Sequence, residues 1–108
     1  MRLIVVIIQD RDADAVVNAL TAVGQRITRI GTTGGLLQQG LSTLLIGVSD
    51  DALPEVITTI QKHSSRRTMF MPLGIGIGDP VYTLSEQVEV EIGGSTIFVF
   101  DVEQFVQI

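Results

Sequence analysis

Leu3-Ile4-Val5-Val6-Ile7-Ile8 is a continuous apolar run in which every residue after Leu3 is β-branched. Such a short unbroken run predicts a strand that is buried on both faces in the middle of a sheet. The polar residues 9–12 end the run, which is far too short for a membrane span or for the apolar core of a signal peptide. We therefore expect a cytoplasmic protein built around this strand.

Helical patterns follow this strand and a second apolar run. Apolar residues recur at the i, i+3, i+4 spacing over residues 13–23, with Asp10 or Asp12 as the expected N-cap and Gly24 as the expected end. The same spacing returns over residues 53–60. Both segments are therefore predicted to be amphipathic helices with one face in the core.

The remaining apolar segments predict strands. Residues 42–48 are nearly all apolar and should form a second central strand, whereas the more polar residues 26–31 should lie nearer an edge. Residues 68–85 show no regular pattern. Residues 88–100 place Gly93-Gly94 between two strand-like runs, which predicts a hairpin with a two-residue turn.

The order strand, helix, strand, strand, helix, strand is typical of an α+β, ferredoxin-like βαββαβ sandwich. It predicts a four-stranded antiparallel sheet with two helices on one face, plus a C-terminal hairpin. The first and third strands should occupy the centre of this sheet. With 108 residues, the chain is expected to be a single domain over 1–108.

Composition limits the partners. Hydrophobic residues make up 45% of the chain and charged residues 18%, which is apolar for a small protein and suggests a homo-oligomer. The net charge of −5 argues against binding a nucleic acid polymer. The lack of cysteine and the single histidine, His63, exclude disulfides, zinc–thiolate centres and multi-histidine metal sites, and no cofactor is implied.

Nothing in the sequence indicates an enzyme. The aspartates stand at expected helix starts, and Glu89 and Glu91 occupy the polar face of a strand, so no general acid–base pair emerges. The run Gly74-x-Gly76-x-Gly78 lacks the spacing of a dinucleotide fingerprint. Residues 69–77 are predicted to form an apolar loop, for which partner docking and packing on the chain's own core both stay open.

A candidate ligand site begins at Thr32-Thr33-Gly34-Gly35. Adjacent glycines permit positive φ angles and a close approach of the backbone to a ligand. Arg26 and Thr28 share one face of the preceding strand, and a guanidinium binds phosphate bidentately beside backbone N–H groups. A plain Gly-Gly turn and a polar edge strand are the alternatives that local sequence leaves open.

Four motifs together indicate a known family: Ile8-Gln9-Asp10, Thr32-Thr33-Gly34-Gly35, Gly47-Val48-Ser49-Asp50-Asp51 and residues 88–99. With them the chain resembles, nearly end to end, the PII-like cyclic di-AMP receptors, a mainly bacterial branch of the PII signalling superfamily. The resemblance implies a PII-like domain over 1–108 that forms homotrimers and has no catalytic activity. Such proteins bind cyclic di-AMP in clefts between subunits and signal through their loops.

The resemblance also implies a set of ligand-binding residues, which are Arg26, Thr28, Gly35, Leu36, Leu37, Leu41, Gly47 and Gln107. Arg26 and Thr28 would contact phosphate and base. The two leucines that follow the glycines would flank an adenine. Gly47 would allow close approach from the third strand, and the glutamine near the C-terminus would complete the cleft.

Two of these positions depart from the family's usual residues. The family usually has an aromatic residue where Leu36 stands and an asparagine, which reads a base edge, where Leu41 stands. Losing such a polar contact costs about 1–3 kcal/mol, so the resemblance implies weaker binding of cyclic di-AMP or a related nucleotide in its place. ATP is disfavoured because residues 101–108 contain no Lys or Arg. The competing hypothesis is a ligand-free trimeric scaffold that docks an unknown target protein through the apolar loop 69–77.

Overall fold

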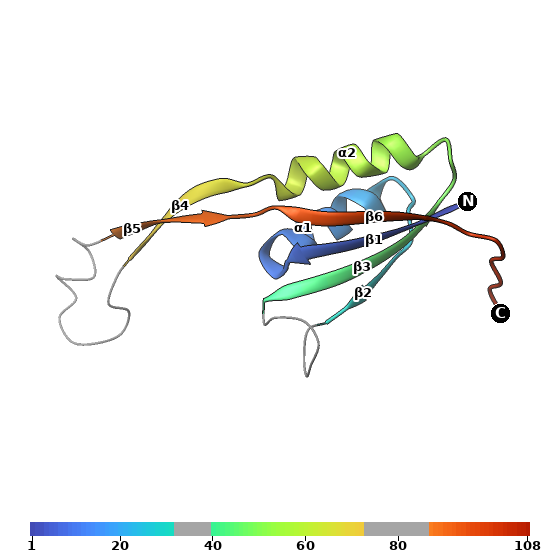
Figure 1. Ribbon diagram of the computed structural model, residues 1–108, viewed down its shortest axis with the longest axis horizontal. Coiled ribbons are helices and arrows are strands. Elements are labelled where there is room, and N and C mark those ends of the chain that lie inside the picture. Colours follow the sequence, from blue (N-terminus) through green and yellow to red (C-terminus); the bar gives the residue numbers. More distant parts are fainter. Residues whose placement is uncertain (32–39, 73–86) are drawn as a thin grey trace.

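The computed structural model of the protein describes residues 1–31, 40–72 and 87–108. Figure 1 shows two helices beside a sheet, and a two-stranded arm that leaves this body at one end. In chain order the elements are β1 (Arg2–Gln9), α1 (Asp10–Ala22), β2 (Ile27–Ile30), β3 (Leu41–Val48), α2 (Leu53–Ser64), β4 (Arg67–Pro72), β5 (Gln87–Ile92) and β6 (Ser95–Asp101). Within the described ranges, no helix has the length and apolar character needed to cross a membrane.

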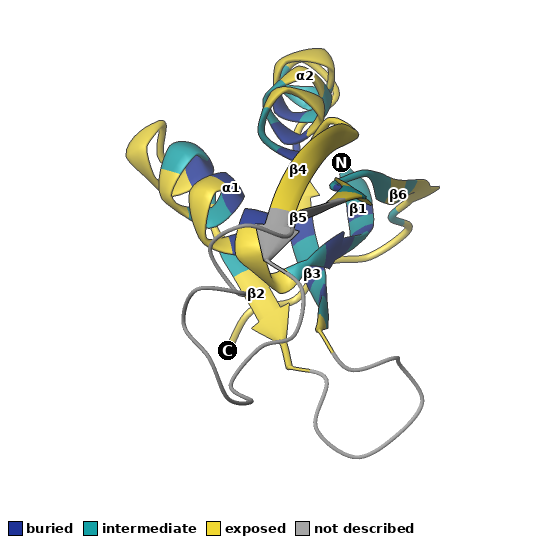
Figure 2. Ribbon diagram, turned by 90° about the vertical axis from the view of Figure 1, so that its left-hand side faces the viewer, coloured by how far each residue is buried: buried dark blue, intermediate teal, exposed yellow. Residues whose placement is uncertain are grey.

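The body is built on one antiparallel sheet whose strand order is β2-β3-β1-β6. β1 and β3 therefore lie in the centre, as their apolar sequences predicted. Both helices pack through their apolar sides onto the core residues of these strands (Figure 2). The architecture is α+β and ferredoxin-like, which confirms the predicted fold class.

The core lies between the helices and one face of the sheet. Alternate residues of the central strands are buried there, among them Ile4, Ile8 and Ile46, and they pack against Val16 of α1 and Ile60 of α2. Each such side chain contributes about 1.5–3 kcal/mol by leaving water. The intervening residues of β1 are only half-buried. The prediction that β1 is buried on both faces is therefore wrong within a single chain. The helices cover one face of the sheet, and the side chains of β1 on the other face stay half-buried.

α1 begins at Asp10 without a side-chain cap, and Gln9 occupies the N-cap position. The prediction that Asp10 or Asp12 caps this helix is therefore wrong. Each carboxylate has another partner, since Asp10 accepts a hydrogen bond from the Ser42 hydroxyl and Asp12 accepts one from Arg67. Their negative charge in the first turn still favours the helix through its dipole.

The strands on either side of Gly93-Gly94 do not pair with each other. β5 pairs with β4, and β6 pairs with β1 along its whole length, where Ile97 packs against the core. The two glycines, with φ angles of 89° and 88°, join β5 to β6 almost in line (Figure 1). Their N–H groups donate to Gln9 Oε1 and to the Ser64 carbonyl oxygen. The predicted C-terminal hairpin is therefore wrong, because β6 pairs with the free edge of β1 and not with β5.

β4 and β5 form the two-stranded arm, so residues 68–72 are a strand where the sequence predicted irregular chain, and residues 73–86 lie outside the described residues. At its base, Arg67 donates to the buried Asp12, with Nη2–Oδ1 at 2.7 Å and Nη1–Oδ2 at 3.4 Å. Its Nη1 also donates to the Ser65 carbonyl oxygen at 3.0 Å. The hydrogen bond to Asp12 raises the pKa of Arg67, a guanidinium that is charged at neutral pH in any case, and the pair ties the arm to α1.

Candidate functional site

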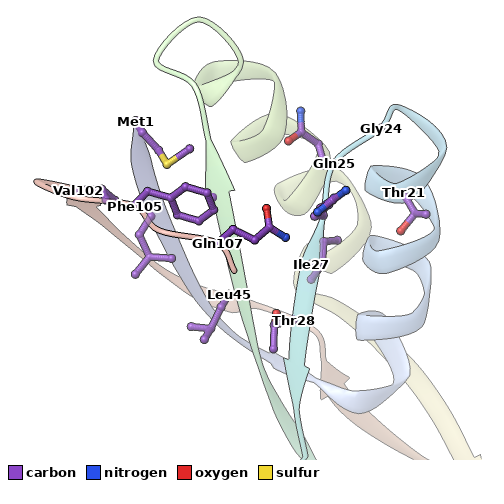
Figure 3. A pocket seen from close by; sticks show the side chains of 13 residues that line it. Met1, Thr21, Gly24, Gln25, Ile27, Thr28, Leu45, Val102, Phe105 and Gln107 are labelled. Carbon is purple, nitrogen blue, oxygen red and sulfur yellow. The ribbon is translucent and has the colours of Figure 1, made fainter.

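A hollow of about 1000 Å³ opens at the end of the sheet where β1 begins and β3 ends. Four segments of the chain contribute to its lining. The lining residues are Met1, Leu3, Thr21, Gly24, Gln25, Arg26, Ile27, Thr28, Leu45, Gly47, Val102, Phe105 and Gln107. Figure 3 shows their side chains around the hollow, with Gln107 lying between Phe105 and Ile27 of β2. We call residues 102–108, which follow β6, the C-terminal tail.

The strand register explains why distant residues meet in this hollow. Thr28 is paired with Leu45, and Gly47 is paired with Leu3. Paired residues of an antiparallel sheet point to the same face. This is the face away from the helices, because Ile46, between Leu45 and Gly47, is buried in the core. The hollow therefore has part of the uncovered sheet face as its floor.

The end of α1 brings polar residues to the rim. Gly24 has a φ of 85°, and the N–H groups of Gly24 and Gln25 donate to the carbonyl oxygens of Thr21 and Leu20, both at 3.0 Å. This is the glycine-dependent Schellman termination of a helix. It turns the chain directly into β2, so that Gln25 and Arg26 line the hollow.

Gly47 leaves the floor of the hollow without a side chain. It lies inside a central strand, where glycine weakens the strand and often marks a place that a ligand or another backbone approaches closely. Its φ does not require glycine, and a Cβ built on it meets no atom within 4 Å. Nothing in the described fold therefore demands glycine here, and the floor of the hollow is open to close approach at this position.

The chemistry of the lining suits a small anion with a flat ring. Among the described lining residues, Arg26 alone has a charged side chain. It takes part in none of the ion pairs in the described part of the chain. Threonine and glutamine side chains also line the hollow, while Leu3, Leu45 and Phe105 supply apolar surface. A free guanidinium next to neutral donors binds phosphate well, even on a chain with a net charge of −5.

Four of the eight sequence-predicted ligand residues meet at this hollow: Arg26, Thr28, Gly47 and Gln107. Leu41 does not, because it begins β3 opposite Gln9, at the other end of the strand. Gly35, Leu36 and Leu37 lie outside the described residues, as does the rest of the Thr32-Thr33-Gly34-Gly35 stretch.

Sequence reasoning missed several lining residues. Leu45 could have been found from strand alternation, because it lies two residues before Gly47 on the same face. Gln25 follows the glycine that ends α1, so the helix-end signal pointed near it. Phe105 gave no local signal, since its place depends on where the tail runs after β6.

Arg29 lies three residues after Arg26, and the structure gives it a different role. It is paired with the buried Leu44 and therefore points to the helix side of the sheet. Its Nη1 donates to Asp14 at 2.5 Å, and its Nε donates to the buried Ser42 hydroxyl at 3.3 Å. Arg29 thus joins β2 and β3 to α1 and does not face the hollow.

Catalytic groups do not gather at this site. Among the described residues, no three His, Cys, Asp or Glu side chains come close enough to hold a metal ion. The described lining contains no carboxylate or histidine that could act as a general acid or base.

Comparison with known proteins identifies relatives over the whole chain. A family model described as the cyclic-di-AMP receptor matches residues 1–108. Among solved structures, the chain is similar to a crystal structure of a functionally unknown protein from Pediococcus pentosaceus ATCC 25745. The two share 34% sequence identity, the match covers 99% of this chain and 96% of that chain, and the TM-score is 0.76.

Proposed function

Because the chain belongs to the cyclic-di-AMP receptor family, we propose that it is a non-enzymatic signal-transduction protein of the cytoplasm that binds cyclic di-AMP or a related nucleotide in the described hollow. One observation carries this proposal. Arg26, Thr28, Gly47 and Gln107, which come from distant parts of the sequence, line the same hollow. Their chemistry matches a nucleotide that offers phosphates, hydrogen-bonding base edges and flat rings.

Each of these residues has a defined task in the proposed complex. The Arg26 guanidinium binds a phosphate, and the Thr28 hydroxyl hydrogen-bonds to phosphate or base. The missing side chain of Gly47 lets the ligand lie directly against β3. The Gln107 amide offers both a donor and an acceptor to a base edge.

We further propose that the protein works as a homotrimer, with the nucleotide between subunits and the loops carrying the response. The sheet face away from the helices supports this proposal, because its apolar residues lack a cover within the described chain. Phe98 and Phe100, which are paired with Val5 and Leu3 of β1, are 46% and 51% exposed. Apolar patches of this kind mark interaction surfaces. Sedimentation should give three times the 11.7 kDa mass of one chain, and Phe98→Ser should lower that mass.

Isothermal titration calorimetry with cyclic di-AMP tests the proposed function. The wild-type protein should give a saturable heat, and Arg26→Ala should weaken binding by about 10- to 100-fold through the lost charged hydrogen bonds. Arg66→Ala is the matched control, because it removes the same charge from a residue whose partner is Glu91 on the arm. Titrations with cyclic di-GMP, ATP and ADP define the nucleotide class.

Gly47→Ala separates ligand binding from folding. The added methyl group meets no atom of the described chain, so the melting temperature should not fall. The same methyl group occupies the floor of the hollow and should weaken nucleotide binding. A folded wild-type protein that gives no heat with any of these nucleotides at high micromolar concentration refutes the proposal.

A ligand-free scaffold remains the second candidate, and one feature of the arm favours it. Met69 and Phe70 of β4 are 41% and 66% exposed, so the arm offers large apolar side chains to a partner. The rest of the proposed docking loop, residues 73–77, lies outside the described residues. In a scaffold, Phe70→Ser should abolish pull-down of a target protein while nucleotides have no effect. If nucleotide addition changes the amount of target protein pulled down, docking through the arm is part of the nucleotide-dependent signalling function and not a separate one.

A further inference from the structure

Phe105 is an aromatic ring that the C-terminal tail carries to the hollow. The tail is fixed at its root, where the Val102 N–H donates to the Met1 carbonyl oxygen at 3.3 Å. Three residues later the Phe105 ring lines the hollow, and Figure 3 shows it close to Met1 and Val102. The ring is nevertheless 61% exposed. The described fold therefore brings a large apolar surface to this place without burying it.

The neighbours of the ring define what it can bind. The same hollow contains the Arg26 guanidinium, an anion-binding group without an ion-pair partner among the described residues, and the Gln107 amide. A nucleotide offers a phosphate to the first, a base edge to the second and a flat π surface to an aromatic ring. Among the described lining residues, Phe105 alone has an aromatic side chain.

We propose that Phe105 is a specificity-determining residue on whose ring a purine base of the bound nucleotide stacks. This inference rests on the proposed function, and it deepens that function by assigning the recognition of the base to the C-terminal tail. Stacking requires a flat aromatic ligand, so the site should reject anions that offer only phosphate and sugar. Larger bases stack more strongly, so the site should also prefer purines to pyrimidines.

Substitution of Phe105 measures this contribution directly. Phe105→Leu keeps an apolar side chain but loses the ring face, and should weaken cyclic di-AMP binding by about 5- to 100-fold in calorimetry. Phe105→Tyr keeps the ring and should bind within about twofold of wild type. Phe70→Leu is the matched control, because Phe70 is similarly exposed at 66% but lies on the arm, away from the hollow. Thermal unfolding of each variant establishes that the affinities compare folded proteins.

A fluorescence experiment distinguishes stacking from a merely structural role of the tail. The chain contains no tryptophan, so Phe105→Trp introduces a single indole reporter. Stacking with a purine quenches indole emission, so cyclic di-AMP should reduce the signal with the affinity found by calorimetry. Ribose 5-phosphate, which has no base, should leave the emission unchanged.

The outcomes separate this inference from the function on which it rests. No heat with the wild-type protein would overturn both. Normal wild-type binding, together with an unchanged affinity of Phe105→Leu and no quenching in Phe105→Trp, would overturn the role of Phe105 and leave the nucleotide site in place. Loss of affinity in Phe105→Leu, retention in Phe105→Tyr and quenching in Phe105→Trp would support it.

Discussion

Gly93→Ala should release the root of the β4–β5 arm from the body. Gly93 has a φ of 89°, and a Cβ built on it would lie 2.3 Å from the Ser65 carbonyl oxygen and 2.8 Å from Arg67 Nη1. The nearest of these atoms belongs to the backbone, so a flexible side chain cannot relieve the overlap by turning away. The Gly93 N–H also donates to Gln9 Oε1 at 2.9 Å, which fixes the glycine from its other side.

The magnitude has two parts. A non-glycine residue in the left-handed region costs about 1–2 kcal/mol, and forcing a methyl group into a packed contact costs about 1–3 kcal/mol. Gly93→Ala should therefore lower the free energy of unfolding by roughly 2–5 kcal/mol. Unfolding entropy scales with chain length, so for 108 residues each kcal/mol corresponds to about 4 °C of Tm. The expected fall in Tm is therefore roughly 8–20 °C.

Gly24→Ala provides the matched control for the contact. Gly24 has nearly the same φ, 85°, but a Cβ built on it meets nothing within 4 Å. Gly24→Ala should therefore show only the cost of the left-handed backbone conformation, about 4–8 °C of Tm. Thermal unfolding followed by circular dichroism, at one fixed protomer concentration, compares the two variants. Equal losses for Gly93→Ala and Gly24→Ala would refute the reasoning, because the close contact with Ser65 would then carry no cost.

Three further predictions concern single side chains. Asp12→Asn should lower Tm more than Glu91→Gln, since the Asp12 side chain is 5% exposed and holds Arg67 with two hydrogen bonds, whereas Glu91 is 66% exposed; equal effects in thermal unfolding would contradict this. Ile60→Val removes one methylene from the core and should cost about 0.5–1.5 kcal/mol in urea unfolding, with an unchanged m value. Arg29→Met should lower Tm but leave the calorimetric affinity for cyclic di-AMP within about twofold, because Arg29 faces α1; a loss as large as that of Arg26→Ala would show that it contacts the ligand.

The sequence predicted the centre of the fold because that information is local. Residues 3–8 and 42–48 are unbroken apolar runs, and these two strands lie in the middle of the sheet. The shared placement of Arg26 and Thr28 also followed from strand alternation alone. The remaining predicted ligand residues came from family resemblance, and two of them, Gly47 and Gln107, line the hollow together with Arg26 and Thr28.

The sequence misled where distant segments compete for the same partner. Gly93-Gly94 between two strand-like runs is a strong local hairpin signal. The second run nevertheless pairs with β1, because a free edge beside the core offers more burial than a hairpin alone. The same principle explains the missed lining residue Phe105, which depends on the path of a tail without regular structure. Competition between distant segments for the same pairing partner cannot be recognised from a short stretch of sequence.

The hollow and the arm root lie at opposite ends of one strand, and this makes their coupling measurable. β6 runs from Ser95, beside the glycines of the arm root, to Asp101, beside the tail that carries Phe105. If nucleotide binding favours one arrangement of the arm, then a substitution at the arm root that shifts the arm between its arrangements must also change the nucleotide affinity, by at most the factor by which the two arrangements differ in affinity. Gly93→Ala, which touches neither the hollow nor its lining, should then change the affinity for cyclic di-AMP by about 5- to 150-fold, a coupling of about 1–3 kcal/mol. An unchanged affinity, measured by calorimetry on the folded variant, would mean that the arm root and the hollow are not energetically coupled. Nucleotide binding would then have to be transmitted through another part of the chain.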